Sequence, residues 1–239
     1  MRIQPHSDML SLVLVGAFNP AIFHPAWFGM NGLLGRIDVE TAEIAVTHPE
    51  FSQFKAGRLG VQVGLNQFTV TCPTAYHGLA KDLVTGTFGQ HLTHTPVLAV
   101  GINRQVHFDA GTFEVRECVG NRLAPKEPWG DWGDALAGEQ GRPDTHGGMM
   151  SLVMRQAKRP DEYRGYIQVD VQPSVQPGLL MTGIYAQTND HYDLADGAAA
   201  PGCRRMLEVI ETKWDWSIDN SAAIIDRLMA LTETCGMKP

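Results

Sequence analysis

The residues best suited to acid–base chemistry lie in a polar stretch toward the C-terminal end of the chain. Residues 189–193 (Asn-Asp-His-Tyr-Asp) combine two carboxylates, an imidazole and a phenol. Such groups can transfer protons or bind a divalent cation. The same residue types also end strands and form turns, and this interpretation is favoured. With His107 from an earlier stretch, the candidate catalytic residues are His107, His191 and Asp193, without an assigned nucleophile.

Other polar residues have the spacing of reactive or metal-binding groups but lack the partners that such sites need. His91 and His94 are three residues apart, which would place them on one face of a helix, but no third metal ligand accompanies them. They equally suit a helix C-terminus. His146 lies in a glycine-flanked segment, and nothing orients it or supplies a nucleophile. The chain also lacks the common phosphate-binding, GxSxG, HExxH and CxxC motifs. No metal site and no cofactor are therefore expected.

Tryptophan residues provide the candidate binding surface. Trp27 lies in an aromatic cluster around Asn19-Pro20, for which core packing is the favoured interpretation. Trp129 and Trp132 lie in a segment rich in glycine and proline, where they either pack on the domain or await a partner. Together with Asn103, these three tryptophans are the candidate binding residues.

Composition and charge limit the classes of partner. The 239 residues are 44% hydrophobic, enough to bury a core, and no apolar run approaches the roughly 20 residues of a membrane-spanning helix. The net charge of −7 falls almost wholly on residues 161–239, which disfavours nucleic acid, although a basic patch around Arg155, Lys158 and Arg159 remains open. No signal peptide is expected, so a cytoplasmic location is predicted. The cysteines are too dispersed for a compact disulfide framework and are expected to be free, buried thiols: Cys72, Cys118, Cys203 and Cys235.

The first half of the chain alternates between strand and helix patterns. Residues 8–18 are apolar with little polar alternation, which predicts a central strand buried on both faces. Asn19-Pro20 predicts a short helix that Pro25 ends or restarts at His24. Alternation predicts a hairpin over 59–65 and 68–72, helical periodicity predicts a helix over 75–91, and 97–108 read as a strand with Gly101 as a possible bulge.

The second half repeats the same order of elements. A helix is predicted over 111–123, an irregular connection over 125–147, and strands near 149–156, 163–171 and 179–188. A helical stripe then runs from 201 to 232, as one helix or as two with a break near Asp219-Asn220. These patterns predict an α+β fold, a largely antiparallel sheet with helices on one face, in two pseudo-duplicated halves. The units are residues 1–124, the connection 125–147, and residues 148–239.

Two segments carry a family resemblance. At residues 95–103 (TPVLAVGIN) and 206–216 (MLEVIETKWDW), the chain is similar to an uncharacterised, sporadically distributed family of bacterial proteins. The family has a short strand ending in Gly-Ile-Asn and a comparable closing helix. The resemblance implies a bacterial origin and a role in a mobile-element or defence-associated gene cluster, and it assigns no catalytic residues.

The sequence therefore predicts a non-catalytic interaction or assembly subunit that binds another protein or itself. Its surfaces would be the open sheet face, the tryptophan segment and the acidic C-terminal helix. The alternative is an enzyme or small-molecule binder with a site between the two halves, lined by Asn103, His107, His191 and Asp193. A third option, nucleic-acid binding across the sheet, is opposed by the charge.

Overall fold

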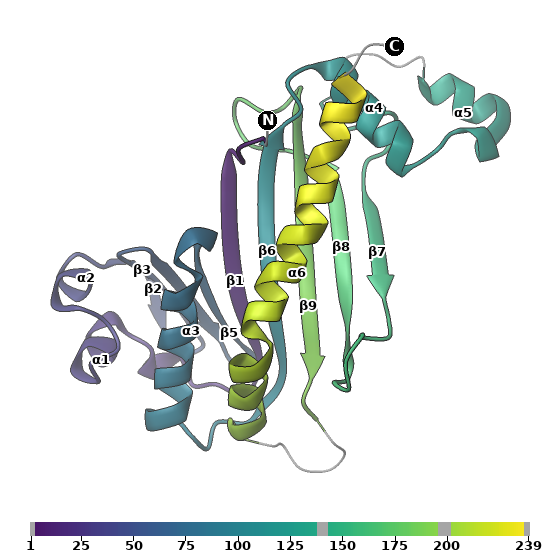
Figure 1. Cartoon of the computed structure of the whole chain (residues 1–239). Helices are drawn as coiled ribbons and strands as arrows, with labels where there is room; N and C mark the ends of the chain where they lie inside the picture. Colours follow the sequence, from purple (N-terminus) through teal and green to yellow (C-terminus); the bar gives the residue numbers. More distant parts are fainter. Residues whose placement is uncertain (1–2, 138–142, 196–201, 237–239) are drawn as a thin grey trace.

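One open antiparallel sheet of nine strands runs through the molecule (Figure 1). The computed structural model describes residues 3–137, 143–195 and 202–236. The strand order is β2-β3-β4-β5-β1-β6-β9-β8-β7, so the two halves of the chain meet at the β1–β6 pair. The predicted α+β fold, with a largely antiparallel sheet, is confirmed.

The elements follow the same order in each half. A strand is followed by helical segments, then by the remaining strands, and then by a helix that returns over the sheet. The strands are β1 (Ser7–Gly16), β2 (Glu43–His48), β3 (Phe51–Ala56), β4 (Leu59–Gly64), β5 (Gln67–Pro73), β6 (Val97–Asp109), β7 (Leu152–Gln156), β8 (Gly165–Pro173) and β9 (Gly183–Asp193). The helices are α1 (Pro25–Met30), α2 (Arg36–Glu40), α3 (His77–Gly86), α4 (Phe113–Leu123), α5 (Gly130–Ala137) and α6 (Arg204–Gly236). Short helical turns are η1 (Pro20–Ile22), η2 (Thr74–Tyr76), η3 (Thr87–His91) and η4 (Glu127–Trp129).

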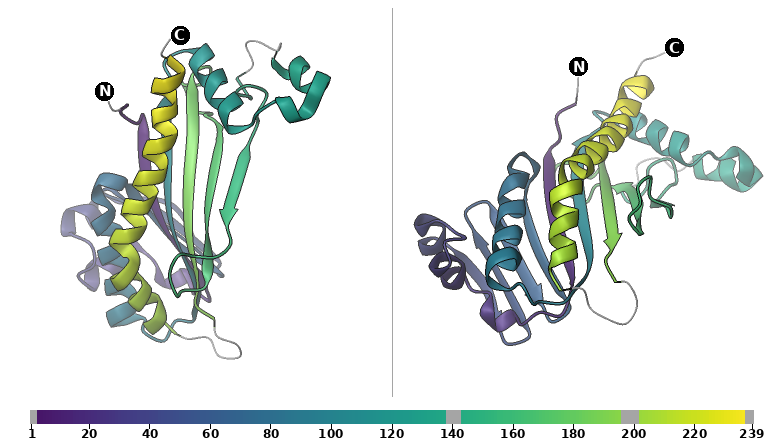
Figure 2. Two further views of the ribbon diagram at one scale, coloured as in Figure 1. Left: turned by 45° about the vertical axis from the view of Figure 1, so that its right-hand side comes forward. Right: turned by 60° about the horizontal axis from the view of Figure 1, so that its bottom comes forward.

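The two long helices cover the same face of the sheet (Figure 2). α3 packs against β5 and β1, and α6 packs against β6 and β9. α6 is one continuous helix of 33 residues, without the break considered near Asp219-Asn220; Pro201, where the predicted stripe begins, lies outside the described residues. Its fully buried Trp214 donates a hydrogen bond from Nε1 to Nδ1 of His77, 2.9 Å away, which joins α6 to α3.

The other face of the sheet is open, and this corrects the prediction for the first strand. Leu10, Leu12 and Leu14 of β1 are fully buried under the helices. Met9 and Val15 point to the opposite side and are 37% and 38% exposed. β1 is central, as predicted, but it is not buried on both faces, because no helix of the described chain covers the second one.

In the first half, aromatic side chains from the connection between β1 and β2 complete the helix-side layer. Asn19 and His24 cap η1 and α1 through their side chains, as the Asn-Pro and His-Pro pairs indicate. The ring of Phe28 then lies 5.7 Å from that of Phe54 on β3. Trp27 is partly buried and packs edge-on against Phe28, so it belongs to this layer.

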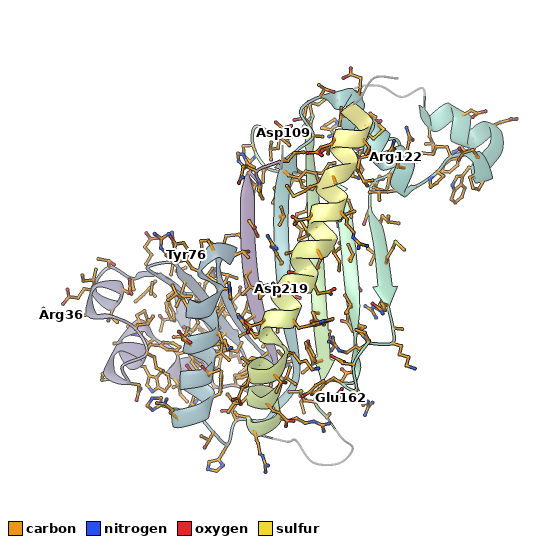
Figure 3. The ribbon with its side chains drawn as sticks, in the orientation of Figure 1. Arg36, Tyr76, Asp109, Arg122, Glu162 and Asp219 are labelled. Atoms are coloured by element: carbon orange, nitrogen blue, oxygen red, sulfur yellow. A yellow bond between two sulfur atoms is a disulfide. The ribbon has the colours of Figure 1, made fainter. Side chains whose placement is uncertain are left out.

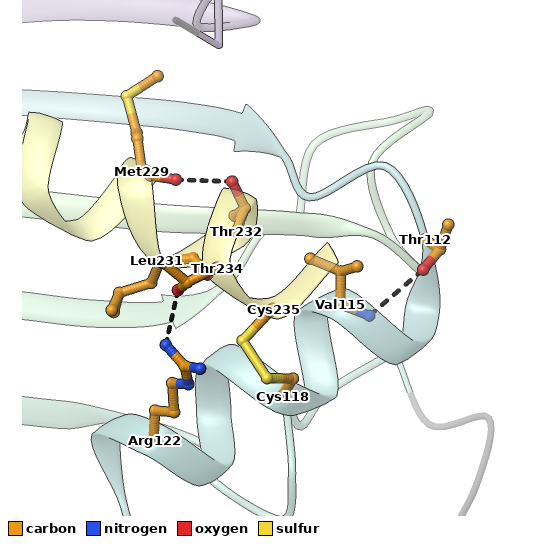
Figure 4. The surroundings of a disulfide bond; sticks show 9 residues. All are labelled: Thr112, Val115, Cys118, Arg122, Met229, Leu231, Thr232, Thr234 and Cys235. Atoms are coloured by element: carbon orange, nitrogen blue, oxygen red, sulfur yellow. Dashed lines mark hydrogen bonds between the residues drawn. A yellow bond between two sulfur atoms is a disulfide. The ribbon is translucent and has the colours of Figure 1, made fainter. Parts of the chain in front are cut away.

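A disulfide joins Cys118 of α4 to Cys235 near the end of α6 (Figure 4). The expectation of four free thiols is therefore wrong for this pair, because the fold brings together helices whose cysteines are 117 residues apart in sequence. Cys72 and Cys203 are free and buried, as expected. Burial raises the pKa of each of these two thiols to about 11, so neither is a reactive thiolate at neutral pH.

A buried ionic network lies under α6 and replaces the basic patch considered around Arg155, Lys158 and Arg159. The fully buried Arg159 side chain forms ion pairs with Asp161 and Asp190. Asp190 also accepts hydrogen bonds from the hydroxyls of Tyr192, at 2.9 Å, and Ser217, at 2.5 Å. Arg155 lies on the other face of the sheet, so the expected cations do not form one surface.

A second buried polar group fastens residues 143–149 to α4. Arg116 is fully buried and donates to the carbonyl oxygens of Thr145, at 2.5 Å, and Leu180, at 2.8 Å. His146 is also fully buried, and neither ring nitrogen has a hydrogen-bond partner among the described residues. Its carbonyl lies so close to Gly120 that a side chain there would collide with it. His146 therefore serves as a packing residue.

The buried His146 predicts a loss of stability in mild acid. Burial, reinforced by the charges of Arg116 and Lys126, lowers the pKa of His146 from 6.5 to about 4. His146 of the unfolded chain is therefore protonated below about pH 6.5, whereas His146 of the folded chain is protonated only near pH 4. This difference should remove about 3 kcal/mol of stability across that range. Urea unfolding at pH 7.0 and 4.5 should show a smaller loss for His146→Leu than for the parent, and no such difference for His94→Leu, which replaces an exposed histidine.

Candidate interaction surface on the open sheet face

The candidate site residues lie on the open face because of the alternation along β6 and β9. Asn103 and His107 of β6 point away from the helices, as predicted for this strand, and so does His191 of β9. The register pairs Asn103 with Asn189, Gly101 with His191, and His107 with Tyr185. The face thus carries the candidate residues across the junction of the two halves.

The segment 189–193 forms the last five residues of β9, so it ends a strand, as the favoured interpretation allows, but it is not a turn. Asp190 and Tyr192 point inward to the ionic network, whereas Asn189, His191 and Asp193 point to the open face. This end of β9 therefore lacks alternating apolar residues, because its inward side chains join a polar network and its outward side chains lie on an open face. The bulge considered at Gly101 is absent, because this residue lies in a regular ladder. The register between β1 and β6 shifts instead at Val15/Gly16.

Planar side chains form a row across β7, β8 and β9. The guanidinium of Arg155 lies 3.9 Å over the ring of Tyr166, which stacks on His191 with 4.6 Å between ring centroids. His191 Nε2 is 3.1 Å from Asp193 Oδ1. Arg155 also donates two hydrogen bonds to Gln168. These contacts pre-organise the row, which reduces the side-chain entropy lost when a partner covers it.

A second group lies at the other end of the central strands. His107 Nδ1 is 2.8 Å from the hydroxyl of Ser174, and its ring lies 4.8 Å from that of Tyr185. Burial, together with the charge of His6, lowers the pKa of His107. Burial also raises the pKa of Tyr185 to about 12, with Asp170 contributing in the same direction. Both side chains are therefore neutral at pH 7.

Two amide oxygens between these groups lack partners. Asn103 is buried and donates from Nδ2 to Ser11 Oγ at 3.4 Å, while its Oδ1 has no hydrogen-bond partner among the described residues. Asn189 Oδ1 is also buried and has no hydrogen-bond partner among the described residues. Both side chains lie beside Gly101, at ordinary van der Waals distance from where its Cβ would be. Both oxygens are buried, so they are unsatisfied acceptors beneath the surface of the open face.

Uncharged polar side chains continue over the first half of the sheet. They border a shallow groove of about 650 Å³ on β3, β4 and β5. Its floor includes Gly60, where a Cβ would come within 2.5 Å of Thr71 Oγ1, so the groove is open there only because residue 60 is glycine. Lys55 and Arg58 supply positive charge at its edge, opposite Glu43. Its lining polar residues on the sheet are Gln53, Gln62, Thr69 and Thr71.

The arrangement does not assemble one catalytic centre. His191 and Asp193 are in contact, but His107 is six residues further along the ladder, about 20 Å away. His191 contacts Tyr166 and Asp193, and neither is a nucleophile that it activates. His91 and His94 are both exposed, and among the described residues no three His, Cys, Asp or Glu side chains are grouped to hold a metal.

The feature that sequence reasoning missed is the apolar centre of this face. Met9, Val13 and Val15 of β1 point outward in the fifth strand of nine. Their signal is hidden in the sequence, because they alternate with leucines of the core and give an apolar run that only Ser11 interrupts. A protein interface commonly has such an apolar centre within a polar surround.

No protein-family model matches this chain, and no curated protein matches it either. No helix among the described residues is long and apolar enough to cross a membrane. The geometry of the open face is therefore the basis for a functional proposal.

Proposed function

We propose that this protein is a non-catalytic assembly subunit that binds a partner protein through the open face of its sheet. The observation that carries the proposal is the outward-facing group Met9, Val13 and Val15 on the central strand, with nothing covering it among the described residues. An open antiparallel sheet face that only meets water normally alternates to polar residues at its centre.

The surround of this apolar centre supports a protein partner. Tyrosine and arginine are enriched at interfaces, and the stacked pair Arg155 and Tyr166 lies on this face. The charge of −7 and the few cations of the face oppose a phosphate backbone.

Site-specific photocrosslinking tests this proposal. A benzophenone amino acid at Met9 or Val15 should give the same crosslinked protein in the native host, because both positions face the same partner. Val13→Arg should reduce that adduct at least about tenfold, since it places a charge at the centre of the contact. Asp215→Arg, an exposed substitution on α6, is the matched control and should leave the adduct unchanged. An equal loss of adduct with Val13→Arg and Asp215→Arg, or no adduct from Met9 and Val15, would contradict the proposal.

We further propose a cytoplasmic location in a bacterium, with the gene in a mobile-element or defence-associated cluster. The resemblance at residues 95–103 and 206–216 supports the gene context. Disulfides are more typical of oxidising compartments, so this location requires the Cys118–Cys235 bond to resist reduction there.

A further inference from the structure

An apolar groove lies on the helix side of the sheet, away from the open face. It has a volume of about 650 Å³ and runs between α6 and the strands β7 and β8. Its apolar lining is Met154, Ile167, Val169, Ile224, Leu228 and Leu231. α6 packs against β6 and β9, so the outer strands of this half are left without a covering helix among the described residues.

The first half of the chain indicates what covers such a position. There, the connection between the first strand and the outer strands supplies Phe23, Trp27 and Phe28, which pack over β3 and β5. In the second half, the corresponding connection joins β6 to β7 and carries Trp129 and Trp132. These tryptophans are 60% and 59% exposed, so the aromatic residues that should complete the layer do not reach it.

Both tryptophans lie on a short arm, η4 and α5, which stands out from the body of the molecule (Figures 1 and 3). Their rings contact each other edge to face, with centroids 5.4 Å apart. The arm is held in this outward position because Leu136 packs against Gly148, where a Cβ would lie 3.1 Å from the Cβ of Leu136. Folding back into the groove of the same chain would break this contact.

We propose that the protein forms a twofold dimer in which the arm of each copy, Trp129 and Trp132, occupies the groove of the other. Charge is complementary in this arrangement. The arm carries Asp131 and Asp134 and no cation within α5, whereas the charged side chain on the helix side of the groove is that of Arg227. A pair of identical surfaces of this kind closes after two copies.

The area is sufficient for a specific interface. A tryptophan buries about 150–250 Å². About 60% of that area is still exposed on each tryptophan, so four tryptophans and the groove residues that they cover together supply about 700–1,200 Å², close to the roughly 1,000 Å² expected of a biological contact. The dimer uses the helix side of the sheet, so it leaves the open face available to a different partner.

Sedimentation velocity of the full chain tests the dimer. Concentrations from about 1 to about 100 µM cover the range in which typical protein dimers dissociate. The expected species has twice the 26.2 kDa of the chain. Trp129→Ala/Trp132→Ala should weaken dimerisation by about 100-fold or more, and Met154→Lys by about tenfold or more. Met150→Lys is the matched control, because Met150 and Met154 are both 65% exposed and only Met154 lines the groove. A monomer throughout, or equal weakening by both lysines, would overturn the proposal.

Cysteine pairing separates the second copy from the same chain as the occupant. Trp132→Cys/Met154→Cys should form covalent dimers under mild oxidation. Covalent closure within monomers would show instead that each arm folds into its own groove, which overturns the dimer.

Mixing Trp129→Ala/Trp132→Ala with Met154→Lys should restore one of the two contacts, because one variant retains its groove and the other its arm. A monomeric result would leave the open-face proposal intact, since that face is separate.

Discussion

Replacing Asp190 with alanine is expected to lower the free energy of unfolding by about 3–5 kcal/mol, because it leaves a buried cation with one fewer counter-charge. Asp190 is 4% exposed and pairs with the fully buried Arg159 side chain. It also accepts hydrogen bonds from the hydroxyls of Tyr192 and Ser217, so three buried donors each lose one acceptor. Burial, reinforced by the negative charge of Asp190, raises the pKa of Tyr192, so the phenol stays protonated as a donor.

Urea unfolding followed by circular dichroism measures this loss. Asp8→Ala is the matched control, because Asp8 likewise pairs with an arginine, accepting two hydrogen bonds from Arg104, but remains partly exposed. Its removal should cost no more than about 1 kcal/mol. Arg159→Met/Asp190→Leu should be less destabilised than Asp190→Ala, since it removes both charges and retains apolar volume. Equal losses for Asp8→Ala and Asp190→Ala would show that the buried network adds nothing.

The same residues explain where sequence patterns succeed and fail. The hairpin of β4 and β5 and the helix α3 follow local periodicity, so they can be predicted from one sequence alone. The polar strand β9 breaks that rule, because its inward residues serve an ion pair with Arg159, thirty-one residues earlier in the chain. The composition of residues 189–193 therefore indicates a turn, because the sequence does not show that Arg159 pairs with this strand.

The candidate surface was only partly predictable, for a related reason. Alternation in β6 places Asn103 and His107 on one side, which the sequence supports. Whether that side is covered depends on the packing of α3 and α6 on one face only, and no local pattern encodes this. The outward group on β1 was consequently read as core. The composition of residues 125–147 predicts an irregular connection, yet the segment contains η4 and α5, because helices of eight residues or fewer give little periodic signal.

Breaking the Cys118–Cys235 disulfide is expected to lower the free energy of unfolding by about 2–4 kcal/mol. The bond closes a loop across 117 residues of sequence, so it strongly restricts the unfolded chain. It also joins α4 to the end of α6, where Arg122 of α4 donates a further hydrogen bond to Thr234, at 2.6 Å. A single exposed hydrogen bond cannot replace a covalent link, so the contact between these helices should loosen on reduction.

Urea unfolding with and without a strong reductant tests the disulfide, with Cys118→Ser/Cys235→Ser as the companion variant. The parent should lose stability in reductant and approach the variant, whereas the variant should not respond. Cys72 and Cys203 provide the internal control: they are buried free thiols, so the reductant has no bond to break at either position. A parent protein whose unfolding midpoint ignores the reductant, while alkylation and mass measurement show that the pair is reduced, would mean that helix packing alone holds α4 on α6.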